Sequence, residues 1–226
     1  SDLVSVNGDL TLDGGLNITT LTGFGVGSYR LFNYSGNLTD NTLTVAPLPV
    51  GYEASIDTST AGQVNLIVSN TTYPITLLDD GHGALDCSPN PVTHGSSATC
   101  TVTPDTGYSI ASVSGCAGSL SGDSYTTGAI TANCTVSASF SLNVYTVSAG
   151  SSGHGSISPA SIVVNHGGNA SFSVTPDSDY ELASVSGCGG SLSGNTYTTG
   201  AITAETTTRS TPEAAAAAAS ARKACT

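Results

Sequence analysis

Histidine is the residue of this chain best suited to chemistry, and it occurs in two equivalent pairs. His82 and His94 form one pair and His154 and His166 the other, with the same spacing and with glycine after each member. If neighbouring strands carried both members of a pair, two imidazoles could meet on one face and hold a metal ion. Histidine beside glycine is also typical of a turn tip, where His tolerates unusual backbone angles. We expect turns here, and therefore no metal site.

Serine is abundant enough for a Ser-His pair to arise, so a small secreted hydrolase using His82 or His154 is one alternative function. The Gly-x-Ser-x-Gly elbow of such enzymes does not occur, because residues 118–122 carry leucine at the nucleophile position. The acidic turns at 79–81 and 176–179 lack the ligand ladder of a calcium loop. The sequence therefore predicts no catalytic residue and no cofactor.

Tyrosines that recur at equivalent places leave a glycan-binding module as a second alternative. A tyrosine ring can cover the C–H face of a sugar while its hydroxyl donates a hydrogen bond. The chain has no tryptophan, however, and a tyrosine shortly after a Pro-Asp turn more often packs onto the core. We expect structural roles for Tyr73, Tyr108, Tyr125, Tyr145, Tyr180 and Tyr197.

The elements that must position these residues belong to a tandem duplication. Residues 73–132 align on residues 145–204 at a constant offset of 72 without a gap, and 32 of the 60 positions are identical. Short runs rich in Val, Ile, Tyr and Thr alternate with Gly, Pro and Asn turns, and no window has an amphipathic helical period. The pattern predicts two small β-sandwiches or rolls at 73–144 and 145–204.

The duplicated sequence also resembles a known family. YTVSAGSSGHGSISP, followed by VNHGGNASFSVTPDSDYELASVSGCGGSLSGNTYTTGAITA, is similar to the divergent internalin-B-type bacterial repeats. That family occurs in tandem on large secreted and cell-surface proteins, so the resemblance implies a spacer or adhesive module without catalysis. Its units often end in a strand like residues 133–140, NCTVSASF. At 205–212 only Thr207 matches, so we expect the second repeat to lack its last strand and 205–226 to be an Ala-rich tail outside the repeat.

The cysteines can be read against the duplication. Cys87 aligns with Pro159 and Cys100 with Phe172, so both disappear together, as a bonded pair would. Cys116 aligns with Cys188, and the partner of each is expected in the final strand, where Cys134 supplies it in the first copy. The favoured pairing is therefore Cys87–Cys100 and Cys116–Cys134, each worth about 3 kcal/mol in the chain-entropy model. Cys188 and Cys225 are left over, as unpaired thiols, as a pair or as a link between chains.

Residues 1–72 contain neither the repeat nor a cysteine. The phrases GDLTLDGG, GSYRLFNYSG and VGYEASIDTSTAGQVNLIVS resemble the last coils of the β-helical passengers of autotransporter-like surface proteins. The resemblance implies that this segment is the end of a right-handed solenoid. The whole chain is thus predicted to be all-β, with a β-helix-end-like segment before two tandem repeats.

Charge restricts the class of partner. Sixteen acidic residues face four basic ones, a net charge of −12, and Arg30 is the only base before residue 205. Such a chain repels phosphate backbones, which excludes nucleic acid, and it has no apolar run of membrane-spanning length. We expect a non-catalytic, secreted bacterial surface protein of adhesin type that acts as a spacer or adhesive module. Its expected partners are surface glycan or matrix, or a second copy paired through a sheet edge of 145–204 or through Cys188 or Cys225.

Overall fold

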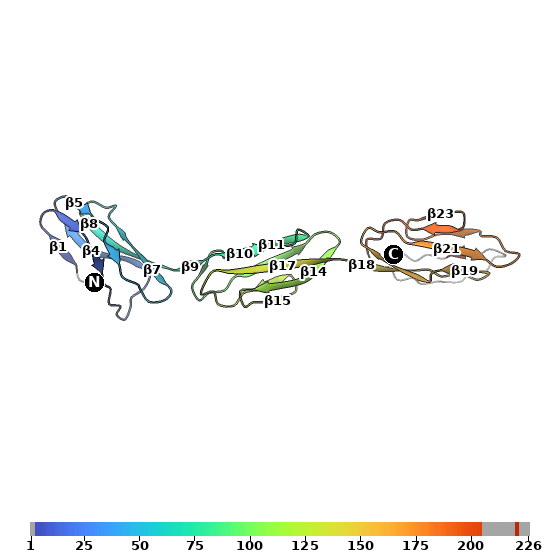
Figure 1. Ribbon diagram of the computed structural model, residues 1–226, viewed down its shortest axis with the longest axis horizontal. Helices are drawn as coiled ribbons and strands as arrows, with labels where there is room; N and C mark the ends of the chain where they lie inside the picture. The colour runs from blue at the N-terminus through green and yellow to red at the C-terminus, as the bar shows by residue number, and fades with distance from the viewer. Residues whose placement is uncertain (1–2, 205–219, 222–226) are drawn as a thin grey trace. The chain divides into compact units, whose positions relative to one another are not determined.

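The computed structural model describes residues 3–204 and 220–221. The chain divides into two compact units, and the boundary between them runs through the first repeat. Unit 1 holds the described residues within 1–79, 85–102 and 113–138, and unit 2 holds those within 80–84, 103–112 and 139–221. The described residues form strands and turns and contain no helix (Figure 1). The predicted all-β class is confirmed.

The N-terminal segment begins with two stacked coils. Its strands are β1 (Val4–Val6), β2 (Leu10–Leu12), β3 (Gly15–Leu16), β4 (Gly27–Tyr34), β5 (Leu38–Asp40) and β6 (Thr44–Val45). β1 pairs in parallel with β4, β2 with β5 and β3 with β6. Three successive parallel pairs in the same chain order are the geometry of a solenoid, in agreement with the expected β-helix end.

Two antiparallel strands close this stack. β8 (Gln63–Asn70) pairs with β4 on one side and with β7 (Tyr52–Asp57) on the other. Val64, Leu66 and Val68 of β8 are buried, so this strand supplies much of the core of the segment. The side chain of Asn65, which is also buried, accepts a hydrogen bond of 2.9 Å from Arg30 Nε, which satisfies its carbonyl.

The first repeat is built from two sheets and a short two-stranded ladder. Its strands are β9 (Thr72–Tyr73), β10 (Ile75–Leu78), β11 (Gly83–Ser88), β12 (Val92–Thr93), β13 (Thr99–Pro104), β14 (Tyr108–Gly115), β15 (Ser119–Ser121), β16 (Ser124–Thr126) and β17 (Cys134–Leu142). One sheet has the order β11-β13-β16-β15, the other β10-β17-β14, and β9 pairs with β12. Alternate residues of β13 and β17 are buried, as expected for strands with one face on a core.

The second repeat reproduces the first sheet. Its strands are β18 (Val144–Ser148), β19 (Gly155–Ser158), β20 (Ser161–Asn165), β21 (Ser171–Pro176), β22 (Ser184–Val185), β23 (Ser191–Ser193) and β24 (Thr196–Thr198). The order β19-β21-β24-β23 matches that of the first repeat, strand for strand. Its core contains Val147, Val164, Ala170, Phe172 and Ile202.

The second sheet differs between the copies. In the first repeat, β17 lies between β10 and β14, whereas the described part of the second repeat has no strand equivalent to β17. The counterpart of the eight-residue β14 is β22, with two residues. A strand β25 (Ser220–Ala221) pairs in parallel with β22, so these two residues are not helical, although an Ala-rich stretch of this kind has high helix propensity. The rest of the tail lies outside the described residues.

Candidate functional site

The first member of each histidine pair stacks on a tyrosine. The ring of His82 lies on that of Tyr108 with centroids 4.4 Å apart and planes inclined by 9°. His154 lies on Tyr180 in the same way, with centroids 4.1 Å apart and planes inclined by 7°. In the first copy the N–H of Asp105 donates to the carbonyl of His82 over 3.0 Å, which holds the two turns together. These rings therefore contribute to packing between turns.

The second member of each histidine pair packs against a tyrosine ring and against the backbone of a glycine. His94 contacts Tyr73 and His166 contacts Tyr145, with tilted rings whose centroids are 5.8 and 6.0 Å apart. In unit 2, a Cβ placed on Gly107 would lie only 2.5 Å from His166 Cδ2, so the ring occupies space that only glycine leaves free. Nδ1 of His94 and of His166 is buried and has no hydrogen-bond partner in the described structure.

The last tyrosine of each copy is a core residue. Tyr125 and Tyr197 are buried, and the hydroxyl of each donates to a backbone carbonyl, that of Gly115 and of Gly187 respectively. A buried tyrosine needs such an acceptor. Of the six recurring tyrosines, these two are buried and the other four are half-buried. They do not form the exposed row of rings that a glycan platform requires.

The described residues do not bring together the side chains that the metal and calcium alternatives require. In the part of the chain that it describes, no three or more His, Cys, Asp and Glu side chains gather as metal ligands would. Asp80 is engaged elsewhere, because its Oδ2 accepts the backbone N–H of Phe140 over 2.9 Å. His82 and His154, the histidines of the hydrolase alternative, present their ring faces to tyrosine.

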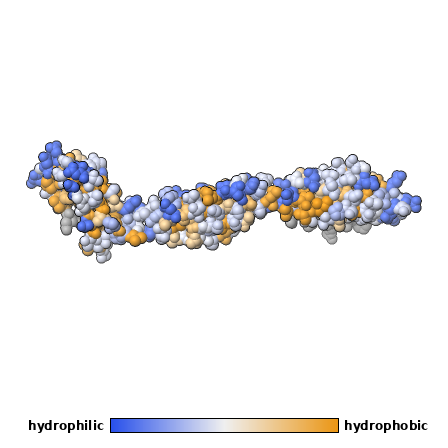
Figure 2. All heavy atoms as spheres, viewed as in Figure 1, coloured by the Kyte–Doolittle hydropathy of each residue, from blue (hydrophilic) through white to orange (hydrophobic). Residues whose placement is uncertain are grey.

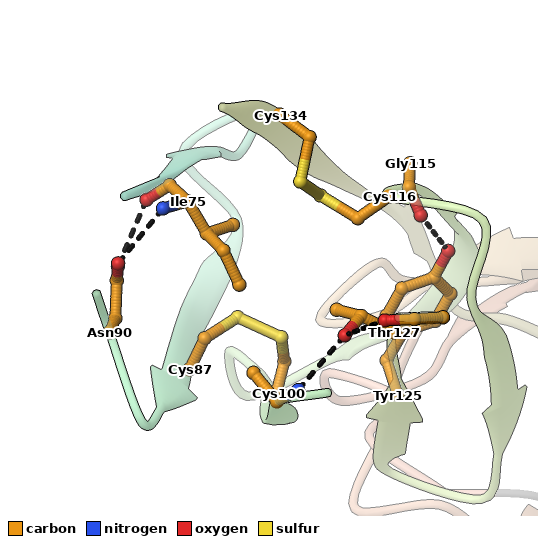
Figure 3. The surroundings of a disulfide bond; sticks show 11 residues. Ile75, Cys87, Asn90, Cys100, Gly115, Cys116, Tyr125, Thr127 and Cys134 are labelled. Carbon is orange, nitrogen blue, oxygen red and sulfur yellow. Dashed lines mark hydrogen bonds between the residues drawn. A yellow bond between two sulfur atoms is a disulfide. The ribbon is translucent and has the colours of Figure 1, made fainter. Parts of the chain in front are cut away.

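Two disulfides lie in the first repeat, with the pairing expected from the duplication (Figure 3). Cys87 bonds Cys100 with a Cα separation of 3.9 Å, and Cys116 bonds Cys134 with a separation of 5.5 Å. Cys188 is also disulfide-bonded, which removes the alternative of an unpaired thiol at that position. Cys225 lies outside the described residues.

Two polar side chains have roles that the sequence did not indicate. The amide of Asn90 both accepts from the N–H and donates to the carbonyl of Ile75, each over 2.9 Å, and so imitates a neighbouring strand (Figure 3). Thr127 is buried, and its hydroxyl accepts the N–H of Ala98 over 2.9 Å, a bond repeated by Thr199 and Ala170. In the sequence, the role of Asn90 was marked by the prolines on both sides of it. The role of Thr127 was marked by its recurrence as Thr199 in the second copy.

The carboxyl of Asp57, the last residue of β7, has a displaced pKa. The Ser59 hydroxyl and then the Ser59 backbone N–H hold the pKa of Asp57 below its usual value, by hydrogen bonds to the charged form. The backbone bond measures 3.0 Å. The carboxylate of Asp57 therefore stabilises the turn at Ser59, which is a structural role.

A groove opens in the second repeat beside β18 and β22. It has a volume of about 370 Å³, including its open mouth. Val147 from β18 and Val185 from β22 line it together with the core side chains Ile157, Phe172 and Tyr197. The lining is mainly apolar, so the groove suits an apolar side chain better than a charged reactant.

The sequence of the chain is similar to that of known bacterial proteins. A segment of 75 residues, 32% of this chain, is 49% identical to an adhesin, the BmaC autotransporter of Brucella suis biovar 1 (strain 1330). That segment corresponds to only 2% of the adhesin's own length. No solved structure matches the chain. Among the described residues no helix is long and apolar enough to cross a membrane. Residues 73–144 and 145–216 each match the divergent InlB B-repeat domain, and since the two matches cover more than half of the sequence, the chain belongs to this family.

Proposed function

We propose that this chain is a non-catalytic, extracellular segment of a bacterial surface adhesin, in which the two repeats act as structural spacers. The observation that carries the proposal is the repeated use of histidine and tyrosine in packing. His82 on Tyr108 and His154 on Tyr180 have the same stacked geometry, although almost half of the aligned positions differ. Residues kept for chemistry would face a pocket or solvent.

The disulfides support an extracellular location for the repeats. Disulfides persist in oxidising compartments and stabilise small domains that lack a large core. The family occurs on bacterial surface proteins, and the similar Brucella protein is named an adhesin. The chain spans only 2% of that protein's length, so the adhesin's name assigns no ligand to these repeats.

A bead assay tests the spacer function. Beads coated with the full chain are passed over surfaces carrying glycans or matrix proteins, beside beads coated with an inert acidic protein at the same density. A spacer predicts equal, background retention of both. If one surface retained the chain-coated beads saturably and did not retain the control beads, the repeats would be an adhesive module and not a spacer. In the same preparation, hydrolysis of ester or peptide substrates that is lost on His154→Gln would favour the hydrolase alternative.

We further propose that the second repeat mediates self-association. Among the described residues β22 has two strand residues, both paired with β25, where β14 has eight, so the described pairing along this edge is shorter than in the first repeat. Val144 and Val163, on the neighbouring β18–β20 ladder, are 56% and 65% exposed. Figure 2 shows hydrophobic residues at several places on the molecular surface in view.

A further inference from the structure

We infer that each repeat recognises a glycine turn in the segment before it, through a joint that holds the linker residue between them in one conformation. The inference rests on the proposed spacer function, to which it adds the contacts that make the spacer stiff. The linker residue is Thr71, the single residue between β8 and β9, or Asn143, the single residue between β17 and β18. The first joint consists of Gly51, Thr71 and His94 and the second of Gly107, Asn143 and His166, and each joint lies within one compact unit.

The backbone of the linker residue is hydrogen-bonded on both sides. In the first joint, the N–H of Thr71 donates to the carbonyl of Gly51, and the carbonyl of Thr71 accepts the N–H of His94, each over 2.9 Å. The linker residue of the second joint makes the same two bonds with its glycine and its histidine, each over 2.8 Å. Because both backbone groups of the linker residue are engaged, rotation about the linker would break hydrogen bonds to the turn and to the repeat.

The imidazole closes each joint by its shape. A Cβ on Gly107 would lie 2.5 Å from His166 Cδ2, and a Cβ on Gly51 would lie 3.1 Å from His94 Cδ2, so each ring rests where the glycine has no side chain. Nδ1 of both imidazoles is buried and has no hydrogen-bond partner in the described structure. The ring therefore does not hold the joint through that nitrogen, and the contact with the glycine is steric.

The duplication does not account for both glycines. The linker residues and the histidines of the two joints are 72 residues apart, as the repeats are, whereas Gly51 does not stand 72 residues before Gly107. Gly51 belongs to the N-terminal segment and precedes β7, and Gly107 belongs to the first repeat and precedes β14. The same joint is thus formed with two segments of different fold.

The two segments share one turn. Gly51 has φ of +94° and Gly107 has φ of +88°, and each is the third residue of a four-residue turn. The turn is closed by the N–H of the following tyrosine, Tyr52 donating to Pro49 over 3.2 Å and Tyr108 to Asp105 over 2.9 Å. The repeat therefore recognises this turn, with its bare glycine and its free carbonyl, and not the fold that carries it.

Hydrogen exchange at the backbone N–H of Asn143 tests the inference in the full chain. His166→Ala removes the ring from the second joint and should speed this exchange about tenfold or more. His166→Phe keeps a ring without Nδ1 and should leave the rate within about threefold of that of the unaltered chain. His154→Ala, in the same unit but outside the joint, is the control and should leave the rate unchanged. Slow exchange in His166→Ala, or equally fast exchange in His166→Phe, would overturn the inference.

A matched pair of glycine variants tests the steric contact. Gly107→Ala brings a methyl group against the ring, whereas a Cβ on Gly194, between β23 and β24, meets nothing within 4 Å. Both glycines have positive φ, so both substitutions disfavour the backbone conformation. Gly107→Ala should speed exchange at Asn143 about tenfold and Gly194→Ala should not. Equal rates in the two variants would contradict the contact.

The unaltered chain decides if a variant fails to fold, which fast exchange at the buried residues Phe172 and Val174 would reveal. The joints predict backbone order parameters of about 0.85 at Thr71 and Asn143, the value of rigid backbone. Values below about 0.6 at both residues would show that the linkers are flexible and would overturn the inference.

The bead assay separates this inference from the proposed spacer function. Rigid linkers in a chain that is retained saturably on one surface would support the joints and reject the spacer. Flexible linkers in a chain with background retention would reject the joints and support a spacer that is a flexible tether.

Discussion

Glycine and histidine cooperate at several contacts of this protein because a missing side chain makes room for a ring. Gly107 has φ of +88°, a conformation that costs other residues about 1 kcal/mol, and its bare Cα faces the ring of His166. Gly95 has a similar φ of +78°, but nothing lies within 4 Å of the place where its Cβ would stand. Substitutions at these two positions therefore separate the free-energy cost of the backbone conformation from the free-energy cost of steric contact with the ring.

We predict that Gly107→Ala destabilises the protein by about 2 kcal/mol or more and Gly95→Ala by about 1 kcal/mol. The difference reflects the collision of the new methyl group with the His166 ring. Denaturant unfolding of the three proteins under identical conditions measures both values. Equal destabilisation by the two variants would show that the ring moves aside freely.

Among the elements, β14 and β22 show that a strand depends on its partner. Residues 111–115 and 183–187 have the same sequence, Ala-Ser-Val-Ser-Gly. In the first copy all five belong to β14, which pairs with β17, whereas in the second copy only Ser184 and Val185 are in strand. Strand assignment requires a hydrogen-bonded neighbour, and local sequence cannot provide one.

We predict that restoring the last strand extends β22. Residues 205–212 are changed to Asn-Ser-Thr-Val-Ser-Ala-Ser-Phe, the sequence of 133–140 with serine in place of cysteine. Hydrogen exchange at 180–187 should slow toward the rate at 108–115, and the thermal midpoint should rise, since apolar side chains now fill the groove. A control with serine at the introduced Val and Phe positions should show neither effect. Unchanged exchange in the restored chain would mean that another feature shortens β22.

The two copies fill the same core position by different means. Cys100 is buried and bonded to Cys87 in the first repeat, and its counterpart Phe172 is buried in the second. Burying a phenylalanine contributes about 1.5–3 kcal/mol, similar to the roughly 3 kcal/mol of a short-loop disulfide. The second copy thus replaces a covalent constraint by apolar area.

We predict that Cys87→Ala with Cys100→Ala lowers the free energy of unfolding by about 3 kcal/mol. Cys87→Ala with Cys100→Phe should recover at least half of that loss, because the ring fills the cavity. Denaturant titration of oxidised protein measures both, and a reductant series on the native chain provides the control. A phenylalanine variant no more stable than the alanine variant would show that a buried phenylalanine cannot replace the disulfide in the core of the first repeat.

At the scale of the whole molecule, acidity and exposed apolar side chains have opposite effects on association. A net charge of −12 keeps copies apart at low ionic strength, whereas the exposed apolar side chains Val144 and Val163 favour contact. Screening by salt weakens only the repulsion. Association should therefore increase with salt.

We predict concentration-dependent self-association that strengthens between low and physiological salt. Multi-angle light scattering over a concentration series, with and without reductant, separates edge pairing from an intermolecular disulfide. Association that persists in reductant indicates edge pairing, and association that vanishes indicates a bond through cysteine. A monomer under all conditions, with slow exchange across 145–204, would show that the repeat closes without an added strand.

The sequence alone determined the features that repeat or alternate locally. The period of two, the turn residues and the offset of 72 established an all-β chain with two copies, and the joint loss of Cys87 and Cys100 indicated their pairing. Each of these depends on residues near in the chain or on comparison of one copy with the other. Resemblance alone indicated the coils of the N-terminal segment, which no repeat within 1–72 revealed.

Only the tertiary structure decided where the rings lie and how far each strand is paired. No local pattern shows that His154 stacks on Tyr180, that His166 lies on Gly107 or that Asn90 imitates a strand beside Ile75. These contacts join residues that are distant in sequence, and their energy depends on distance and orientation in space. For the same reason identical segments became a long strand in one repeat and a short one in the other, since a β-ladder is completed by its neighbour and not by its own residues.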